Sequence, residues 1–307
     1  MTINNDKNLD HEIDLKELAL ALWEKKTTIV SIFLIFSLLS VLYSLSLKDI
    51  YTSSSVLTAT RSDETLSSKI RSFSPLASIA GVPLPTTETS LSQEAIAKIK
   101  SFDFFSNEML PHIQLKNILA VEKWVPKENT IIYDENIYLD KFDKWLGSIE
   151  YPAQTIPSIQ KAHREFKKMV NISVDKNTGF VTLAVSHQSP YLAQKWTALI
   201  IKKINESMRE EEKILAEKSI NFLEETAMKT NLQSIRDAIS NLLESQIKSL
   251  MLVSANENYV YKILDAPIVP EIKSSPQRAI ICIVGSLLGL ILGISISIVM
   301  FLFRKEN

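Results

Sequence analysis

The residue types that usually carry catalysis are sparse in this chain and poorly spaced. Its four histidines are His11, His112, His163 and His187, and no pair has the H-E-x-x-H spacing that places two imidazoles on one helix face. The G-x-S-x-G turn and the phosphate-cradling G-x-x-x-x-G-K-[ST] loop are also missing. The single cysteine, Cys282, excludes an intramolecular disulfide and a Cys-rich metal site. We therefore predict a non-enzymatic protein with no catalytic, cofactor-binding or metal-binding residues, although a glycosidase-type carboxylate pair stays open.

Positive charge gathers on one predicted helix, residues 158–169. The basic side chains of this helix are Lys161, Arg164, Lys167 and Lys168, with His163 between them. Such a face is a candidate contact for an anionic glycan or for lipid headgroups. The alternative, typical of charge runs, is a solvated face on which Glu165 is a neighbour. The whole chain carries 34 basic and 35 acidic residues, so no global basic excess indicates nucleic acid as a partner.

Two uncharged apolar segments near the chain ends explain a mean hydropathy of +0.07 in a protein whose middle is charged. Residues 27–47 lie between Lys26 and Lys48, and residues 279–303 lie between Arg278 and Arg304. About 20 apolar residues can cross a bilayer, where the backbone must form helix to satisfy its hydrogen bonds. We predict two transmembrane helices. A cleaved signal peptide is the alternative for the first, but its preceding arm is long and acidic rather than short and basic.

The flanking charges predict the orientation. Basic residues flank both predicted helices on the side of the chain ends, at Lys16, Lys25, Lys26, Arg304 and Lys305. The positive-inside rule then places both termini in the cytoplasm, with residues 1–26 as an amphipathic arm and residues 304–307 as a tail. Residues 48–278 form one periplasmic domain. This domain contains no thiol, which is compatible with an oxidising compartment.

Three glycines recur at a spacing of four in the second predicted span. Gly285, Gly289 and Gly293 share one helix face and would allow close approach of another helix, either the first span or a neighbouring subunit. The alternative is that glycine is simply frequent in membrane helices.

The periplasmic domain has the pattern of an α+β fold with a small membrane-proximal sheet and a very long helical extension. We predict strands at 50–60 and 259–268, a hairpin at 171–185 around Asn177-Thr178-Gly179, helices at 89–110 and 158–169, and short helices and loops at 117–157. Residues 190–253 contain no internal proline or glycine, and their apolar residues recur at spacings of three and four.

The long helix would begin after Ser189 as cap and would extend about 90 Å. A break between Thr226 and Ser234 is the alternative, because Thr, Asn and Ser lower helix propensity there. The apolar stripe needs a partner surface, which favours side-by-side copies of the chain.

Several segments carry a family resemblance: EIDLKELALALWEKK at 12–26, IYTSSSVL at 50–57, residues 158–196, residues 221–293 and, most specifically, APIVPEIKSSPQR at 266–278 before the glycine-bearing helix. The chain resembles the Wzz family of chain-length determinants, the polysaccharide co-polymerases of Gram-negative inner membranes. By this resemblance Pro267, Pro270 and Pro276 match the proline-rich segment before the last span.

The resemblance implies a homo-oligomer in the inner membrane that works with the O-antigen polymerase and sets the modal length of lipopolysaccharide O-chains. Its implied partners are further copies of itself, the polymerase, membrane lipid and the growing polysaccharide, and no cofactor is implied. The chain stops at residue 307 without the ATPase and tyrosine cluster of the kinase branch, so we expect the non-kinase branch. A length regulator for enterobacterial common antigen or capsule and a two-helix periplasmic sensor are the alternatives. Whether the protein acts as a ruler or as a scaffold stays open.

Overall fold

The computed structural model describes residues 22–60, 91–146, 156–230 and 232–306. It divides into two compact units: Met1–Asp49 with Ser274–Asn307, and Ile50–Lys273. Most of the predicted arm 1–26 lies outside the described residues.

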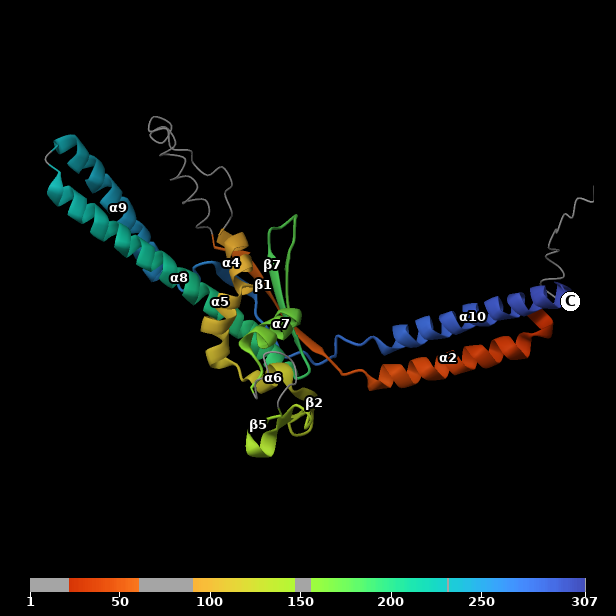
Figure 1. Cartoon of the computed structure of the whole chain (residues 1–307). Helices are drawn as coiled ribbons and strands as arrows, with labels where there is room; N and C mark the ends of the chain where they lie inside the picture. The colour runs from red at the N-terminus through yellow and green to blue at the C-terminus, as the bar shows by residue number, and fades with distance from the viewer. Residues whose placement is uncertain (1–21, 61–90, 147–155, 231, 307) are drawn as a thin grey trace, which may run out of the picture. The chain divides into compact units, whose positions relative to one another are not determined.

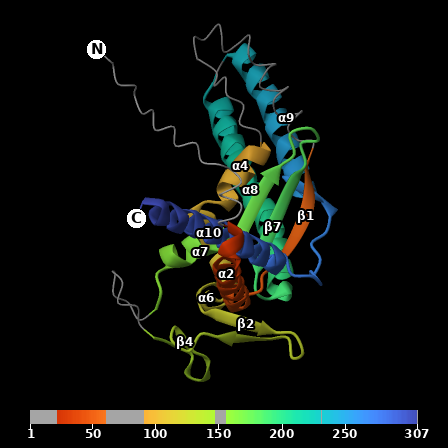
Figure 2. The same ribbon diagram turned by 90° about the vertical axis from the view of Figure 1, so that its right-hand side faces the viewer.

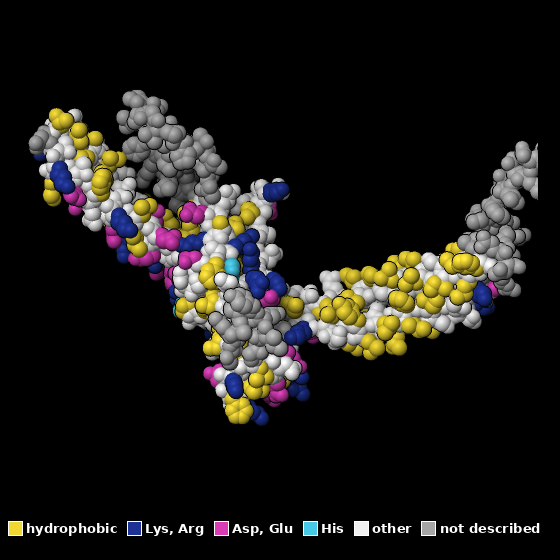
Figure 3. All heavy atoms as spheres, in the orientation of Figure 1, with side chains coloured by type: hydrophobic (Ala, Val, Ile, Leu, Met, Phe, Trp, Pro, Cys, Tyr) yellow, Lys and Arg dark blue, Asp and Glu magenta, His cyan; other side chains and the backbone are white. Residues whose placement is uncertain are grey.

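The first unit is a pair of apolar helices, α2 (Lys26–Ser46) and α10 (Arg278–Glu306), which pack side by side (Figure 1). Both are long and apolar enough to cross a membrane. Their apolar side chains are largely uncovered: Leu38 is 63% exposed and Ile283 is 66% exposed. Helices in the core of a soluble protein bury such side chains, so this pattern favours a lipid environment. Figure 3 shows the apolar surface of the pair as a nearly continuous yellow band.

The second unit contains a four-stranded antiparallel sheet in the order β6-β7-β1-β8. Its strands are β1 (Tyr51–Ala59), β6 (Val170–Val174), β7 (Val181–His187) and β8 (Tyr261–Asp265). The predicted strands 50–60 and 259–268 are thus neighbours in one sheet. A bulge separates Val56 from Leu57 in the β1–β8 ladder. The buried Ser53 and Ser55 hydroxyls donate to the carbonyls of Ile268 (2.7 Å) and Asp265 (2.6 Å). These side-chain bonds join β1 to residues 265–268 where the backbone ladder is interrupted.

The predicted hairpin 171–185 is confirmed by β6 and β7. Gly179 has a φ of +73°, which a residue without a Cβ adopts readily, and its N–H donates to the Asp175 carbonyl. The Asp175 carboxylate accepts from the N–H groups of Asn177 and Thr178, and these bonds lower its pKa.

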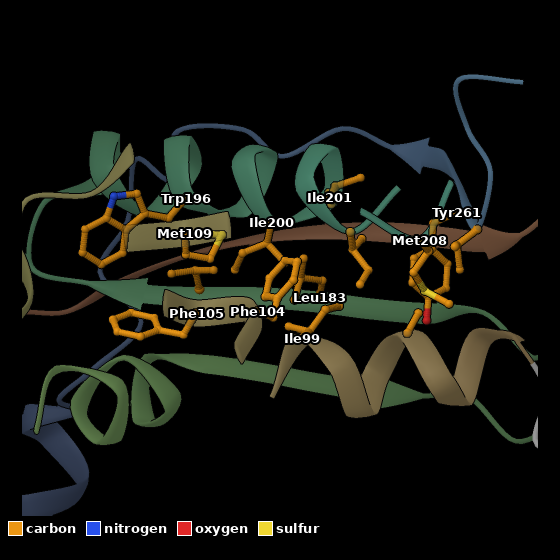
Figure 4. Packing of buried hydrophobic residues seen from close by; sticks show 14 of the residues in the cluster. Ile99, Phe104, Phe105, Met109, Leu183, Trp196, Ile200, Ile201, Met208 and Tyr261 are labelled. Carbon is orange, nitrogen blue, oxygen red and sulfur yellow. The ribbon is translucent and has the colours of Figure 1, made fainter. Parts of the chain in front are cut away.

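The core lies between the sheet, α8 (Pro190–Lys229) and the segment 91–113. Along α8, Trp196, Ile200 and Ile204 are buried, and the inward residues of β7 meet them. Figure 4 shows side chains of α8, β7 and residues 99–109 packed together in one layer. As predicted, Ser189 caps α8 by accepting from the Leu192 N–H, and Pro190 occupies the first turn.

The prediction of one helix over 190–253 is wrong. Helix α8 ends at Lys229, and α9 (Gln233–Ala255) turns back and packs along it (Figure 1). The break lies in the window 226–234, where Thr226 and Thr230 bond back to carbonyls one turn earlier and Arg236 Nε donates to the Thr230 carbonyl. The 40 residues of α8 extend about 60 Å rather than 90 Å.

Two further predicted segments differ from the structure. The helix expected at 89–110 is divided at Ser101, which caps a new helical start, into α4 (Leu91–Ile99), α5 (Phe102–Phe104), η1 (Phe105–Met109) and η2 (Leu110–His112). The segment 117–157 contains strands as well as short helices: α6 (Leu115–Leu119), β2 (Val121–Val125), β3 (Thr130–Tyr133), β4 (Tyr138–Leu139), η3 (Asp140–Phe142) and β5 (Lys144–Trp145). We call 114–146 the hairpin lobe; Figure 2 shows it at one end of this unit.

The helix expected at 158–169 is confirmed as α7 (Ile159–Met169), with Ser158 as its cap. The fold class is therefore α+β, with a small sheet, a long helical hairpin and two apolar helices near the chain ends.

Candidate functional site

The glycine face of α10 lies directly against α2. A Cβ added at Gly285 would overlap the Ser40 side chain, and one at Gly289 would lie 2.6 Å from Phe36 Cβ. A Cβ at Gly293 would lie 3.2 Å from the Ile29 Cα and carbonyl oxygen. The backbones can approach this closely only because the three side chains are hydrogen atoms.

Polar contacts accompany this packing. Ser286 Oγ donates to Ser37 Oγ at 3.3 Å, between the two helices. At the end of the pair Arg278 Nη2 lies 3.0 Å from Asp49 Oδ1. A hydrogen bond between apolar helices has few competitors in lipid, so the serine contact favours a fixed register of α10 on α2, and the ion pair at the end of the pair is compatible with the same register.

The basic face of α7 is divided between paired and exposed side chains. Ala162 and Phe166 are buried and anchor the opposite face. Lys168 Nζ lies 2.8 Å from Glu165 Oε1, while Arg164 and Lys167 are exposed. Lys161 is half-buried near the start of the helix. The proposed contact with an anionic glycan or lipid therefore depends on Arg164 and Lys167 more than on the other two side chains.

The three prolines singled out in the sequence lie in different units. Pro267 and Pro270 follow β8, and the Pro267 carbonyl accepts from Gln194 Nε2 on α8 at 3.3 Å. Pro276 lies in the helical-pair unit, where its carbonyl accepts from the Arg278 N–H at 3.0 Å. The structure thus gives the first and third of these residues distinct backbone contacts.

Asn205 is a structural residue that the sequence reading missed. It is 4% exposed on α8, where its Oδ1 accepts from the N–H groups of Val260 (2.8 Å) and Tyr261 (2.9 Å). Its Nδ2 donates to the Tyr261 carbonyl at 3.0 Å. One amide therefore holds the start of β8 against the long helix. A polar residue directly after Ile204 in an apolar stripe was the available signal.

His187 is also buried, at the end of β7. Its Nδ1 accepts from the Ser189 N–H (2.9 Å), so Nε2 carries the proton and donates to the Asn117 carbonyl (2.8 Å). Burial lowers its pKa, because the charged imidazolium is poorly solvated there. The ring packs edge-on against Trp196 at 4.9 Å. Both hydrogen bonds of this imidazole go to backbone groups, so the contacts are structural.

Exposed apolar side chains lie along the helical hairpin of α8 and α9. The most exposed of them are Leu215 (59%), Phe222 (67%), Met228 (83%), Leu232 (63%), Met251 (67%) and Leu252 (57%). Figure 3 shows yellow side chains at the outer end of this hairpin. Helix α9 covers part of the predicted stripe, so the surface left for a partner is smaller than the sequence indicated.

Metal-type clusters are not found in the part of the chain that the structure describes: no three His, Cys, Asp or Glu side chains gather there. What the geometry presents is a tightly packed apolar helical pair, a small sheet and a long hairpin with an apolar surface.

One protein-family model matches the N-terminal third of the chain. Residues 11–107 match the family described as Wzz, chain length determinant protein. This segment of the chain is similar to the Wzz chain-length-determinant family. The match includes α2, β1 and α4, so the resemblance to the Wzz family that the sequence indicated is confirmed over this part. The Wzz segment therefore joins the first apolar helix directly to a central strand of the sheet.

Solved structures similar to this chain include a full-length bacterial polysaccharide co-polymerase, at 14% identity and a TM-score of 0.41, covering 96% of this chain and 99% of the other. A fragment of WzzB, a polysaccharide co-polymerase from Salmonella Typhimurium, is similar at 12% identity and a TM-score of 0.32, covering 74% and 100%. No curated protein matches the sequence.

Proposed function

We propose that this protein regulates the modal chain length of lipopolysaccharide O-antigen, or of a related surface polysaccharide. The observation that carries the proposal is the Wzz match across residues 11–107, which includes the first apolar helix and the strand that follows it. The role is that of a non-catalytic scaffold that acts with the polymerase.

The proposed location is the bacterial inner membrane, with two passes and with both termini in the cytoplasm. Two helices of sufficient length and apolarity support this, as do the basic residues Lys25 and Lys26 before the first. The domain between them, residues 48–278, would then lie in the periplasm, where surface glycans are elongated.

The proposed assembly is a homo-oligomer in which copies stand side by side. Its support is the apolar surface of the helical hairpin, where Phe222 and Met228 are 67% and 83% exposed. Large exposed apolar side chains on a long hairpin mark an interaction surface. Identical copies are the natural occupants, because each copy presents the same surface.

Deletion of the gene in its host tests the proposal. Lipopolysaccharide separated on a gel should lose its modal cluster of bands and show a broad ladder, and the wild-type gene on a plasmid should restore the cluster. Capsule and enterobacterial common antigen are compared in the same strains, because a change confined to one of them would identify that polymer as the target. Unchanged length distributions in all three would refute the proposal.

A further inference from the structure

The hairpin lobe contains a groove that none of the features above uses. Its volume is about 480 Å³, and it is open to solvent. The residues that line it are Gln114, Leu115, Lys116, Tyr138, Asp140, Asp143 and Trp145. They come from α6, β4, η3, β5 and the residues next to them, so four short elements that are close in sequence build one concave surface. A concave surface with an aromatic ring and several convergent polar groups is typical of small-ligand sites.

The aromatic part of the groove is held in place by cross-strand packing. Tyr138 and Trp145 are paired residues of β4 and β5, and their ring centroids are 5.0 Å apart. Tyr133 packs edge-on against Tyr138 at 5.6 Å. Tyr138 is only 2% exposed, whereas Trp145 is half-buried. The indole is therefore the aromatic surface that a ligand can reach, and a flat apolar ring suits the C–H face of a pyranose.

The polar part of the groove is also preorganised. Lys116 Nζ lies 3.0 Å from Asp140 Oδ1. The same Nζ lies 5.0 Å from the ring centroid of Tyr133 and 5.1 Å from that of Tyr138, within the range of a cation–π contact. The Tyr138 hydroxyl donates to Asp143 Oδ1. Both bonds use Oδ1, so each carboxylate keeps a second oxygen that can accept from a hydroxyl group.

Asp143 has an unusual backbone. Its φ of +48° is left-handed, a conformation that residues with a Cβ rarely adopt. The position follows η3 directly and brings the carboxylate to the Tyr138 hydroxyl and to the groove. A strained residue that is part of a lined groove is a common companion of ligand binding.

The charge of the groove selects the kind of sugar. Two carboxylates oppose one ammonium group, so an acidic sugar is disfavoured, whereas a neutral sugar offers hydroxyl donors to the carboxylates. We propose that this groove binds a neutral hexopyranose unit of a polysaccharide, with Trp145 against the ring face and Asp140, Asp143 and Gln114 bonding to hydroxyls. Identifying this polysaccharide with the polymer whose length is regulated rests on the proposed function.

Saturation-transfer difference NMR on the full-length protein in lipid nanodiscs tests this site directly. The probes are neutral oligosaccharides of glucose, galactose, mannose, rhamnose and N-acetylglucosamine, with an oligogalacturonate as the acidic counterpart. At least one neutral oligosaccharide should receive saturation, and the acidic one should receive less. If no neutral probe receives saturation, or if the acidic probe alone does, the proposal is overturned.

Variants locate the binding within the lobe. Trp145→Ala should weaken the affinity for the best neutral probe by about tenfold, as expected for the loss of an aromatic contact. Gln114→Ala, which removes a groove amide without touching the aromatic cluster, should weaken it several-fold. Phe142→Ala is the matched control, because Phe142 is a 75% exposed aromatic of the same lobe that does not line the groove. Wild-type affinity in both Trp145→Ala and Gln114→Ala would refute the site.

The outcome is independent of the length-regulation test. Circular dichroism and the thermal midpoint show whether each variant is folded. If Trp145→Ala is not folded, the affinity of Gln114→Ala tests the site. If gene deletion leaves every polysaccharide unchanged but binding still depends on the groove, the deletion result refutes only the proposed function, and the site stands. Loss of the modal bands on deletion without any binding to the groove refutes only the site.

Discussion

Two buried polar side chains, Asn205 and His187, join segments that are far apart in the sequence. Asn205 connects α8 to the start of β8, and His187 connects the end of β7 to α6 through the Asn117 carbonyl. Each makes bonds that water would otherwise supply, so their removal leaves buried backbone groups unpaired. Their contribution lies in fixing which backbone segments meet, rather than in chemistry.

Asn205→Ala should lower the free energy of unfolding by about 3 kcal/mol, because it leaves the buried N–H groups of Val260 and Tyr261 without an acceptor. Denaturant unfolding of the full-length protein in detergent, followed by circular dichroism, measures this loss. Asn221→Ala is the matched control, since Asn221 is exposed on the same helix. Equal stability of the two variants would contradict the role of Asn205.

The pKa of His187 predicts an acid-sensitive stability. Burial places its folded-state pKa below the ordinary value of 6.5, so the unfolded chain binds the proton more readily. The free energy of unfolding should therefore fall as the pH decreases below about 6.5, until the pH reaches the lowered folded-state pKa. His187→Gln does not titrate in this range and should lose this part of the pH dependence. If the free energy of unfolding changes equally in the wild-type and His187→Gln proteins between pH 7 and pH 5, His187 is not the source of this pH dependence.

At the scale of elements, the sequence predicted the strands, the hairpin around Gly179 and the two apolar helices, because each has a local pattern. It gave a break between Thr226 and Ser234 only as the alternative to one continuous helix, and the structure has the break there. The apolar stripe of 190–253 is compatible with a continuous rod against a neighbour and with two helices against one another, and only tertiary contacts distinguish these. The short strands of the hairpin lobe were missed because strands of two to five residues carry too little periodicity.

Among the candidate functional features too, those with a local sequence pattern were predicted, and those that depend on tertiary contacts were not. The helical period places Gly285, Gly289 and Gly293 in line, and in the structure a Cβ at each of them would meet residues of α2. The groove of the hairpin lobe could not be predicted, because Gln114, Tyr138 and Trp145 become neighbours only after two turns have formed. Asn205 was detectable only as a polar interruption, and its partners at 260–261 were not visible in the sequence.

Gly289→Leu should separate α2 from α10, because a side chain there would overlap Phe36 and approach the backbone at Phe33. Overpacking of this kind costs about 1–3 kcal/mol, so the thermal midpoint should fall, and the modal chain length or oligomer stability should shift. Ser295→Leu is the control, because Ser295 is exposed on the same helix and receives the same bulk. A Gly289→Leu protein as stable as the Ser295→Leu protein, with unchanged chain length, would contradict the packing.

At the scale of the whole molecule, the proposed function uses two features: apolar helices near the chain ends, which would lie in a membrane, and a hairpin whose apolar surface would contact identical copies. The two features are complementary in the proposed function, since the spans concentrate the copies in one plane and the hairpins then associate. Neither feature requires a catalytic group.

Phe222→Asp should weaken the oligomer, because it places a charge in the apolar surface of the hairpin, where Phe222 is 67% exposed. Mass photometry in detergent should show a shift from a discrete oligomer toward smaller species. Asn221→Asp adds the same charge at the neighbouring exposed position and should leave the distribution unchanged. An unaltered oligomer in Phe222→Asp would show that copies associate through another surface.

The most direct measurement is the distribution of repeat units per polysaccharide chain in a deletion strain that carries either the wild-type gene or an empty vector. With the gene, the account predicts a narrow maximum at a fixed number of repeats. Without it, chain termination should be random, and the abundance should decrease steadily with length. Superimposable distributions in the two strains would contradict the account.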